Sequence, residues 1–190
     1  MSAAIDFKRT HHMAGNLFTP LRSEADRNAC ELSPEQVAFF HENGYCRGPR
    51  VLDDHQIAVL RESLEQMRLG KNPRMNELYE VDQAYRDAPE KAVFHFLGAW
   101  MIDEGFHDIL FHPKIMVPVS QLLDTPQVRM WHDQVFYKPP RHPGVVAWHQ
   151  DYSYWTRATP PGPITVLMVP NNTNVESGCV HVISKTHRWA

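Results

Sequence analysis

The chain has 190 residues and a formal net charge of −3, long enough for one domain with a substantial core. It lacks a run of basic residues, which argues against a nucleic-acid partner, and no apolar run approaches the length of a membrane span. Three cysteines without a CxxC motif (Cys30, Cys46 and Cys179), together with no signal-peptide pattern, predict a cytoplasmic protein without a disulfide framework.

The N-terminal third predicts helices after a loose arm. Residues 1–28 are polar and mixed, and His11 and His12 within them are expected to be exposed rather than metal-bound. Ser33, Pro34 and Gln36 form a helix-start pattern with a capping box, and the helix is predicted to stop at Asn43 and Gly44.

Three further helices are predicted before residue 124. The first is capped by Asp53 or Asp54, has one apolar face and ends at Gly70. That face comprises Ile57, Leu60, Leu64 and Met67. The other two helices are predicted over residues 103–111 and 113–123.

The rest of the chain predicts strands. Val, Ile, Phe, Tyr and Trp are concentrated in four segments with turn residues between them, at residues 127–138, 145–151, 164–169 and 179–184. Pro139 and Pro140 end the first segment, because proline cannot donate a ladder hydrogen bond. Strands at this spacing favour a β-sandwich or barrel.

The most informative motif lies in the second of these segments. His149 and Asp151 are two residues apart, so on a strand their side chains would share one face. A His and a carboxylate are part of the 2-His-1-carboxylate triad that holds Fe(II) in oxygenases. A solvated strand end is the alternative. The aromatic residues at 152–155 favour a pocket, with ordinary barrel core as their own alternative.

Several motifs in this order resemble one family. They are YKPP at 137–140, WHQDYSYW at 148–155 and ESGCVHVISKTHRW at 176–189, with an N-terminal match that begins near Leu32. They resemble the phytanoyl-CoA dioxygenase family of Fe(II)/2-oxoglutarate-dependent oxygenases. Ser184 and Lys185 stand where the family usually has Pro and Gly, and Leu167 lies near a position often occupied by Trp.

The resemblance implies a mainly β fold with N-terminal helices (α+β), a double-stranded β-helix of the jelly-roll or cupin-like type. Residues 29–190 would form the N-terminal part of one such domain, with helices to about residue 124 and barrel strands from about residue 127. The family's distal His and its Arg normally lie further along the chain than Ala190. We therefore expect an incomplete barrel and a fragment or an early stop.

The resemblance also assigns the site. His149 and Asp151 would bind Fe(II), with 2-oxoglutarate and O2 as cosubstrates and ascorbate as a supporting reductant. Three residues are candidates for cosubstrate binding: Lys138, Gln134 and Trp155. Tyr152 and Trp131 are candidates for the substrate pocket. Whether His181 or His187 could replace the distal His stays open.

The expected function is hydroxylation of an unactivated C–H bond of a small organic substrate. Without the distal His and Arg, the 190 residues alone are expected to be inactive. The alternative is a non-catalytic remnant, or a binding or oligomerisation module on the same fold. A small-molecule partner is expected, without nucleic acid or membrane, and the substrate and oligomeric state stay open.

Overall fold

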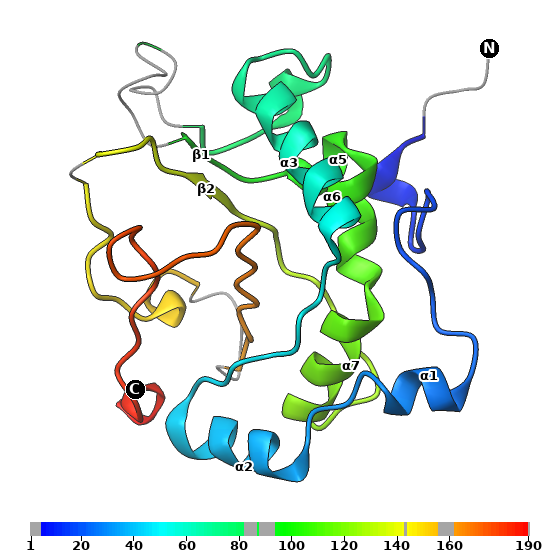
Figure 1. The fold of residues 1–190 in the computed structure, drawn as a ribbon, viewed down its shortest axis with the longest axis vertical. Coiled ribbons are helices and arrows are strands. Elements are labelled where there is room, and N and C mark those ends of the chain that lie inside the picture. Colours follow the sequence, from blue (N-terminus) through cyan, green and yellow to red (C-terminus); the bar gives the residue numbers. More distant parts are fainter. Residues whose placement is uncertain (1–4, 82–86, 88–93, 143, 156–161, 190) are drawn as a thin grey trace. The chain divides into compact units, whose positions relative to one another are not determined.

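The computed structural model describes residues 5–81, 87, 94–142, 144–155 and 162–189 (Figure 1). The chain divides into two compact units, and each is described by itself. Unit 1 comprises Met1–Pro20, Leu52–His112 and Arg129–Val145. Unit 2 comprises Leu21–Val51, Pro113–Val128 and Val146–Ala190.

Most of the regular elements in the described part of both units are helices. Unit 1 contains η1 (Phe7–Arg9), α3 (Asp54–Arg68), η2 (Met75–Glu77), β1 (Phe94–Phe96), α5 (Ala99–Ile102), α6 (Glu104–Asp108), η3 (Ile109–Phe111) and β2 (Val135–Tyr137). Unit 2 contains α1 (Glu24–Asn28), α2 (Pro34–Asn43), α7 (Pro113–Leu122), η4 (Asp151–Ser153) and η5 (Thr186–Arg188). None of the helices in the described residues is long and apolar enough to cross a membrane.

The capping residues begin α2 and α3 as predicted. The Ser33 hydroxyl accepts from the Gln36 N–H and the Gln36 side chain accepts from the Ser33 N–H, a reciprocal capping box. Asp53 and Gln56 form the same arrangement at the start of α3. α2 ends at Gly44, whose φ of 82° is left-handed and costs glycine little. Both predicted helices are confirmed.

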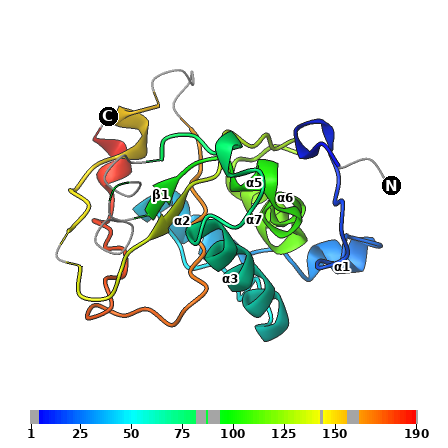
Figure 2. The same ribbon diagram turned by 90° about the horizontal axis from the view of Figure 1, so that it is seen from above.

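The apolar face of α3 leads into the core of unit 1. Leu60 and Met67 are buried, and Met67 packs in a cluster with Phe96, Ala99 and neighbouring side chains. Figure 2 shows α3 beside α5 and α6, which also contact one another. The predicted helix over residues 103–111 is present as α6 followed by the 3-10 turn η3, and the one over 113–123 as α7.

The first of the predicted strand segments forms a strand over only three residues. Within residues 127–138 the strand is β2, antiparallel to β1 in the register Phe94↔Tyr137 and Phe96↔Val135. Asp133, two residues before β2, accepts hydrogen bonds from the backbone N–H groups of Gly98 and Trp100 at 2.7 and 2.8 Å. It thereby caps α5, which has no capping side chain of its own.

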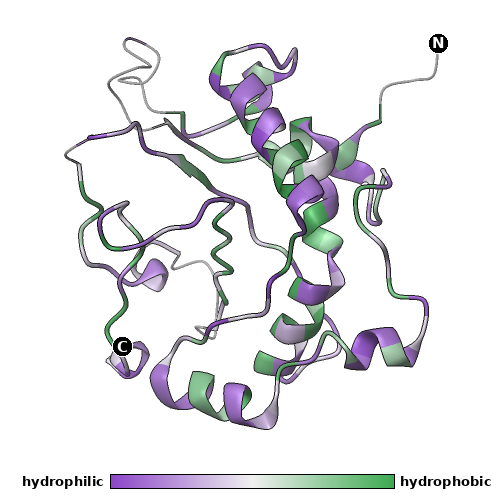
Figure 3. Cartoon of the chain, viewed as in Figure 1, coloured by the Kyte–Doolittle hydropathy of each residue, from purple (hydrophilic) through white to green (hydrophobic). Residues whose placement is uncertain are grey.

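The other three predicted strands are not formed. Residues 145–151, 164–169 and 179–184 contain no strand, although 164–169 is a continuous hydrophobic stretch (Figure 3). Val145 is 87% exposed and Leu167 is 60% exposed. A strand exists only where a neighbour completes its ladder, and in the described residues the named strands are β1 and β2. The mainly β architecture is thus not seen in this part of the chain.

The N-terminal segment is packed over much of its length. Phe7 and Phe18 are buried, and the Asp108 carboxylate accepts from the N–H groups of Ala14 and Gly15, both at 2.7 Å. His107 joins this network through Nδ1, 2.7 Å from Asp108 Oδ1. Residues 7–18 thus make specific contacts with α6, and the loose arm expected over residues 1–28 stays a prediction.

An ion-pair network supports the same segment. Lys8 Nζ lies 2.7 Å from Glu77, and the Arg74 guanidinium also binds Glu77 while it covers the Phe7 ring. Hydrogen bonds from Arg74 and then Lys8 lower the pKa of Glu77 to about 2. Glu77 therefore stays ionised well into the acid range, and its ion pair with Lys8 links η1 to η2.

The Asp108 network predicts a large cost for one substitution. Asp108→Ala leaves two backbone N–H groups and the buried His107 ring without their acceptor, so we expect a loss of about 3 kcal/mol or more in the free energy of unfolding. Urea denaturation measures this loss. Hydrogen exchange at Ala14 and Gly15 should also accelerate, and unchanged protection at both amides would contradict the assignment.

The buried carboxyl of Asp133 predicts that the free energy of unfolding depends on pH. Burial raises the pKa of its carboxyl above the ordinary value, although the N–H groups of Trp100 and Gly98 act in the opposite direction. Below the unfolded pKa of about 3.9 both states are protonated. As pH rises through that value the unfolded state loses its proton first, so stability should fall until the folded carboxyl ionises too.

Two variants separate the charge of Asp133 from its capping. Asp133→Asn should remove the fall in stability above pH 4, as compared with the unsubstituted chain by urea denaturation at a series of pH values. Asp133→Ala should also lose the cap of α5, at a cost of about 1–3 kcal/mol. If the free energy of unfolding changed with pH in the same way in Asp133→Asn and in the unsubstituted chain, this carboxyl would not be the titrating group.

Candidate metal centre

His149 and Asp151 lie together in unit 2. His149 Nε2 is 3.3 Å from Asp151 Oδ1, and the two side chains are 35% and 38% exposed. The backbone between them is not a strand, because Asp151 begins the 3-10 turn η4. The predicted proximity of imidazole and carboxylate is therefore present, although the predicted strand is not. Both groups remain open to a ligand from solvent.

The second ring nitrogen of His149 has its own partner. Nδ1 lies 2.7 Å from the carbonyl oxygen of Ala147, so a neutral ring donates its N–H there. The carbonyl can only accept, so Nδ1 carries a hydrogen, and Nε2 is the ring nitrogen on the Asp151 side. The Tyr154 ring stands edge-on to the imidazole, with 5.7 Å between centroids. Tyr154 thus limits rotation of the ring.

The second oxygen of Asp151 is held as well. The Thr165 hydroxyl donates to Asp151 Oδ2 at 2.5 Å, while Oδ1 is the oxygen near His149. Sequence reasoning did not select Thr165. The sequence did contain a signal for it, because Thr165 is the one side chain with a hydroxyl group in the apolar run at residues 164–169. In each candidate ligand the outer atom, meaning the polar atom that faces away from the other ligand, is therefore hydrogen-bonded. These atoms are Nδ1 of His149 and Oδ2 of Asp151.

Gln150, between the two ligands, is anchored elsewhere. Its side-chain amide donates to the carbonyl of Thr186 at 2.7 Å. Thr186 begins η5, and the preceding Lys185 donates its N–H to the carbonyl of Asn43 at the end of α2. Gln150 therefore connects the candidate site to the end of a capped helix, a role that sequence reasoning also missed.

The pair fits a metal ion. Imidazole nitrogen and carboxylate oxygen bind a divalent metal such as Zn²⁺ at about 2.0–2.2 Å. Two such bonds at the tetrahedral angle hold their donor atoms about 3.4 Å apart, and Nε2 and Oδ1 are separated by 3.3 Å. Outer partners such as Ala147 and Thr165 are the usual means of orienting metal ligands.

A third protein ligand is not assembled in the described residues. Within them, no three His, Cys, Asp or Glu side chains are grouped so that they could hold a metal ion. His187 directs Nε2 to the carbonyl of His41, at 3.3 Å. His181 is exposed. Neither residue lies with the pair in this structure, so His149 and Asp151 are the two candidate ligands that the described residues bring together.

The remaining predicted site residues fall into two groups. Trp131, Gln134 and Lys138 belong to unit 1, where Gln134 Nε2 lies 2.6 Å from His95 Nε2 across the two-stranded sheet. Tyr152 and Trp155 belong to unit 2, in η4 and just after it. Their roles with cosubstrate and substrate remain predictions.

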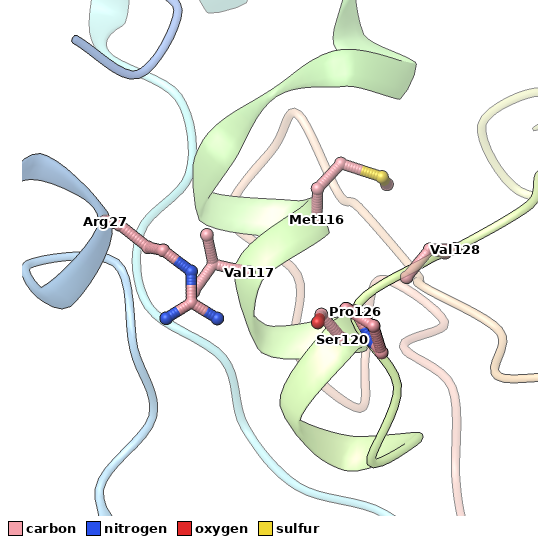
Figure 4. A pocket seen from close by; sticks show the side chains of 6 residues that line it. All are labelled: Arg27, Met116, Val117, Ser120, Pro126 and Val128. Carbon is pink, nitrogen blue, oxygen red and sulfur yellow. The ribbon is translucent and has the colours of Figure 1, made fainter. Parts of the chain in front are cut away.

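A hollow of about 550 Å³ lies elsewhere in unit 2 (Figure 4). It is lined by side chains of α1, α7 and the residues that follow α7: Arg27, Met116, Val117, Ser120, Pro126 and Val128. None of these is a predicted site residue. Arg27 at its edge is already paired with Glu31 at 2.8 Å.

A partly exposed imidazole and a partly exposed carboxylate lie side by side at this position, and they are donor groups of the kind that 2-His-1-carboxylate metal sites use. The chain belongs to the phytanoyl-CoA dioxygenase family, whose sequence model matches residues 40–190. The resemblance is therefore confirmed. No curated protein matches the sequence. The family implies a cupin-like double-stranded β-helix and suggests an Fe(II)/2-oxoglutarate-dependent oxygenase.

The geometry predicts which histidines matter for metal binding. Anaerobic calorimetric titration with Fe(II) should show a site that is lost in His149→Ala and in Asp151→Ala, because each removes one of two protein ligands. His181→Ala and His11→Ala are matched controls that should leave binding nearly unchanged. Equal binding by Asp151→Ala and the unsubstituted chain would refute the site.

Proposed function

We propose that this chain acts in a 2-oxoglutarate-dependent oxygenase that hydroxylates an unactivated C–H bond of a small organic substrate. The observation that carries the proposal is the His149–Asp151 pair, with Nε2 and Oδ1 3.3 Å apart and both outer atoms bound. Family membership supports the same chemistry. Iron held by this pair would supply the reducing centre for O2 and the anchor for 2-oxoglutarate.

The chain's own residues would prepare the site for that metal. His149 would present Nε2 to the metal, because its Nδ1–H is donated to the carbonyl oxygen of Ala147. Asp151 contributes a negative charge that offsets part of the charge of the metal, and Thr165 holds the carboxylate in place. Tyr152 and Trp155, immediately after the pair, are proposed as apolar walls that exclude water from the reacting atoms.

Binding of 2-oxoglutarate also needs a counter-charge. Its distal carboxylate requires a cation or strong donors, because a charge removed from water is costly. Lys138 is the proposed cation and Gln134 a proposed donor, and Trp131 is a proposed wall of the substrate pocket. Lys138 is exposed just beyond β2.

A second candidate function is a non-catalytic binding or oligomerisation module. Two observations favour it: the described residues assemble two rather than three metal ligands, and hydrophobic side chains such as Val145, Val146 and Leu167 are exposed. Exposed apolar surface of this kind marks interaction sites. A module of this kind would bind without turnover of 2-oxoglutarate.

Linked binding separates the two functions. Because 2-oxoglutarate chelates the metal, each should increase the affinity for the other by about tenfold, and the coupling is reciprocal. We expect this coupling in titrations of the unsubstituted chain with Fe(II) under anaerobic conditions and its loss in Asp151→Ala. Independent binding of metal and cosubstrate would favour the non-catalytic module.

Catalytic turnover of 2-oxoglutarate by the 190-residue chain needs a test of its own. With two protein ligands at the site, the 190 residues alone should release no more succinate from 2-oxoglutarate, Fe(II), ascorbate and O2 than the His149→Ala variant does. Succinate release that depends on His149 would show that another residue, such as His181, completes the site.

A further inference from the structure

The contact between Thr165 and Asp151 joins two segments that are separated in sequence. The Thr165 hydroxyl donates to Asp151 Oδ2 at 2.5 Å, and the other oxygen, Oδ1, lies 3.3 Å from His149 Nε2. We infer that Thr165 is a positioning residue that determines which carboxylate oxygen of Asp151 is presented to the metal. This inference rests on the proposed function.

A carboxylate needs such a partner because its two oxygens are equivalent. The side-chain torsion that exchanges them is broad in aspartate, so without a partner Asp151 could present either oxygen or both. A donor on Oδ2 makes the two oxygens different. The hydrogen bond is charge-assisted and therefore stronger than one between neutral groups. Oδ1 is then left as a single, oriented ligand.

Threonine suits this role better than a longer donor. Its branched Cβ restricts rotation about χ1, so the hydroxyl is held near one direction. A hydroxyl has one hydrogen to donate and no positive charge. It therefore orients Asp151 without competing with the metal for the negative charge, as a lysine or arginine at this position would.

The two ligands are held by matching outer contacts. Ala147 accepts the Nδ1–H of His149 at 2.7 Å, and Thr165 donates to Oδ2 of Asp151. One contact comes from the segment before the pair and the other from the segment after it, all within unit 2. The inward atoms Nε2 and Oδ1 consequently face one another across the spacing of two metal ligands.

The alternative is that the hydrogen bond only attaches residues 164–169 to η4. This alternative and the positioning role differ in what a change at Thr165 should do. A purely structural contact would alter stability and leave the properties of a bound metal unchanged. A positioning contact would alter the affinity and the spectrum of the metal, and a hydroxyl alone would restore both.

The test uses Co(II) as the probe, titrated into the 190-residue chain and followed by visible absorption. Thr165→Val keeps the shape and removes the hydroxyl, and we expect Co(II) binding to weaken about 10–100-fold with a changed absorption spectrum. Thr165→Ser keeps the hydroxyl and should restore both the affinity and the spectrum. Thr165→Ala replaces Thr165→Val if the latter fails to fold, as judged by thermal unfolding.

Each outcome decides the inference. Unchanged Co(II) binding in a folded Thr165→Val would overturn it, as would equal losses in Thr165→Val and Thr165→Ser. Asp151→Ala, measured alongside, distinguishes this failure from failure of the proposed function. If Asp151→Ala loses Co(II) and Thr165→Val does not, the metal site stands without the positioning role. If Asp151→Ala binds as before, the site itself is wrong.

Discussion

The Asp133 carboxylate accepts one hydrogen bond on each oxygen, from Gly98 N–H and Trp100 N–H, and the sheet of unit 1 depends on this contact. β1 and β2 pair over three residues each, and a two-stranded ladder of that length has little stability of its own. Asp133 ties the residues next to β2 to those next to β1. Gly98, with φ of 99°, turns the chain so that both N–H groups reach the carboxylate.

Two His–Asp pairs in this chain differ in burial, and the difference determines whether a ligand can reach them. His107 and Asp108 are 1% exposed, and the Asp108 oxygens are used by His107 and by two backbone N–H groups. This pair is closed to any ligand. His149 and Asp151 are more than one third exposed, and Oδ1 of Asp151 lies 3.3 Å from the His149 ring. The same two types of side chain therefore hold a chain segment in place at Asp108 and form the candidate site at Asp151.

The segments around the candidate site are hydrophobic yet lie outside any ladder. Residues 145–148 and 164–169 have the composition of buried strands, and Val145 and Leu167 remain exposed. The fold that the family implies would pair such segments in a double-stranded β-helix. In the described residues they are instead held by side-chain contacts, such as Thr165 to Asp151 and Gln150 to Thr186.

The sequence by itself determined the helix starts and the candidate ligands. Ser33 with Gln36, and Asp53 with Gln56, are local signals, because a capping box involves residues three apart. The proximity of His149 and Asp151 is local too, since two residues of separation suffice in a turn as well as in a strand. The family motifs could also be found in the sequence, because they depend on residue order rather than on geometry.

Only the tertiary structure decided the strands, the packing of the N-terminal segment and the outer partners of the site. Strand formation depends on a neighbour, which the composition of residues 145–151 or 164–169 cannot specify. The contact of Asp108 with Ala14 and Gly15 spans more than 90 residues. Thr165 is 14 residues from its partner Asp151 in the sequence, and Thr186 is 36 residues from its partner Gln150. No local pattern encodes such contacts, because they arise only when distant segments of the chain meet.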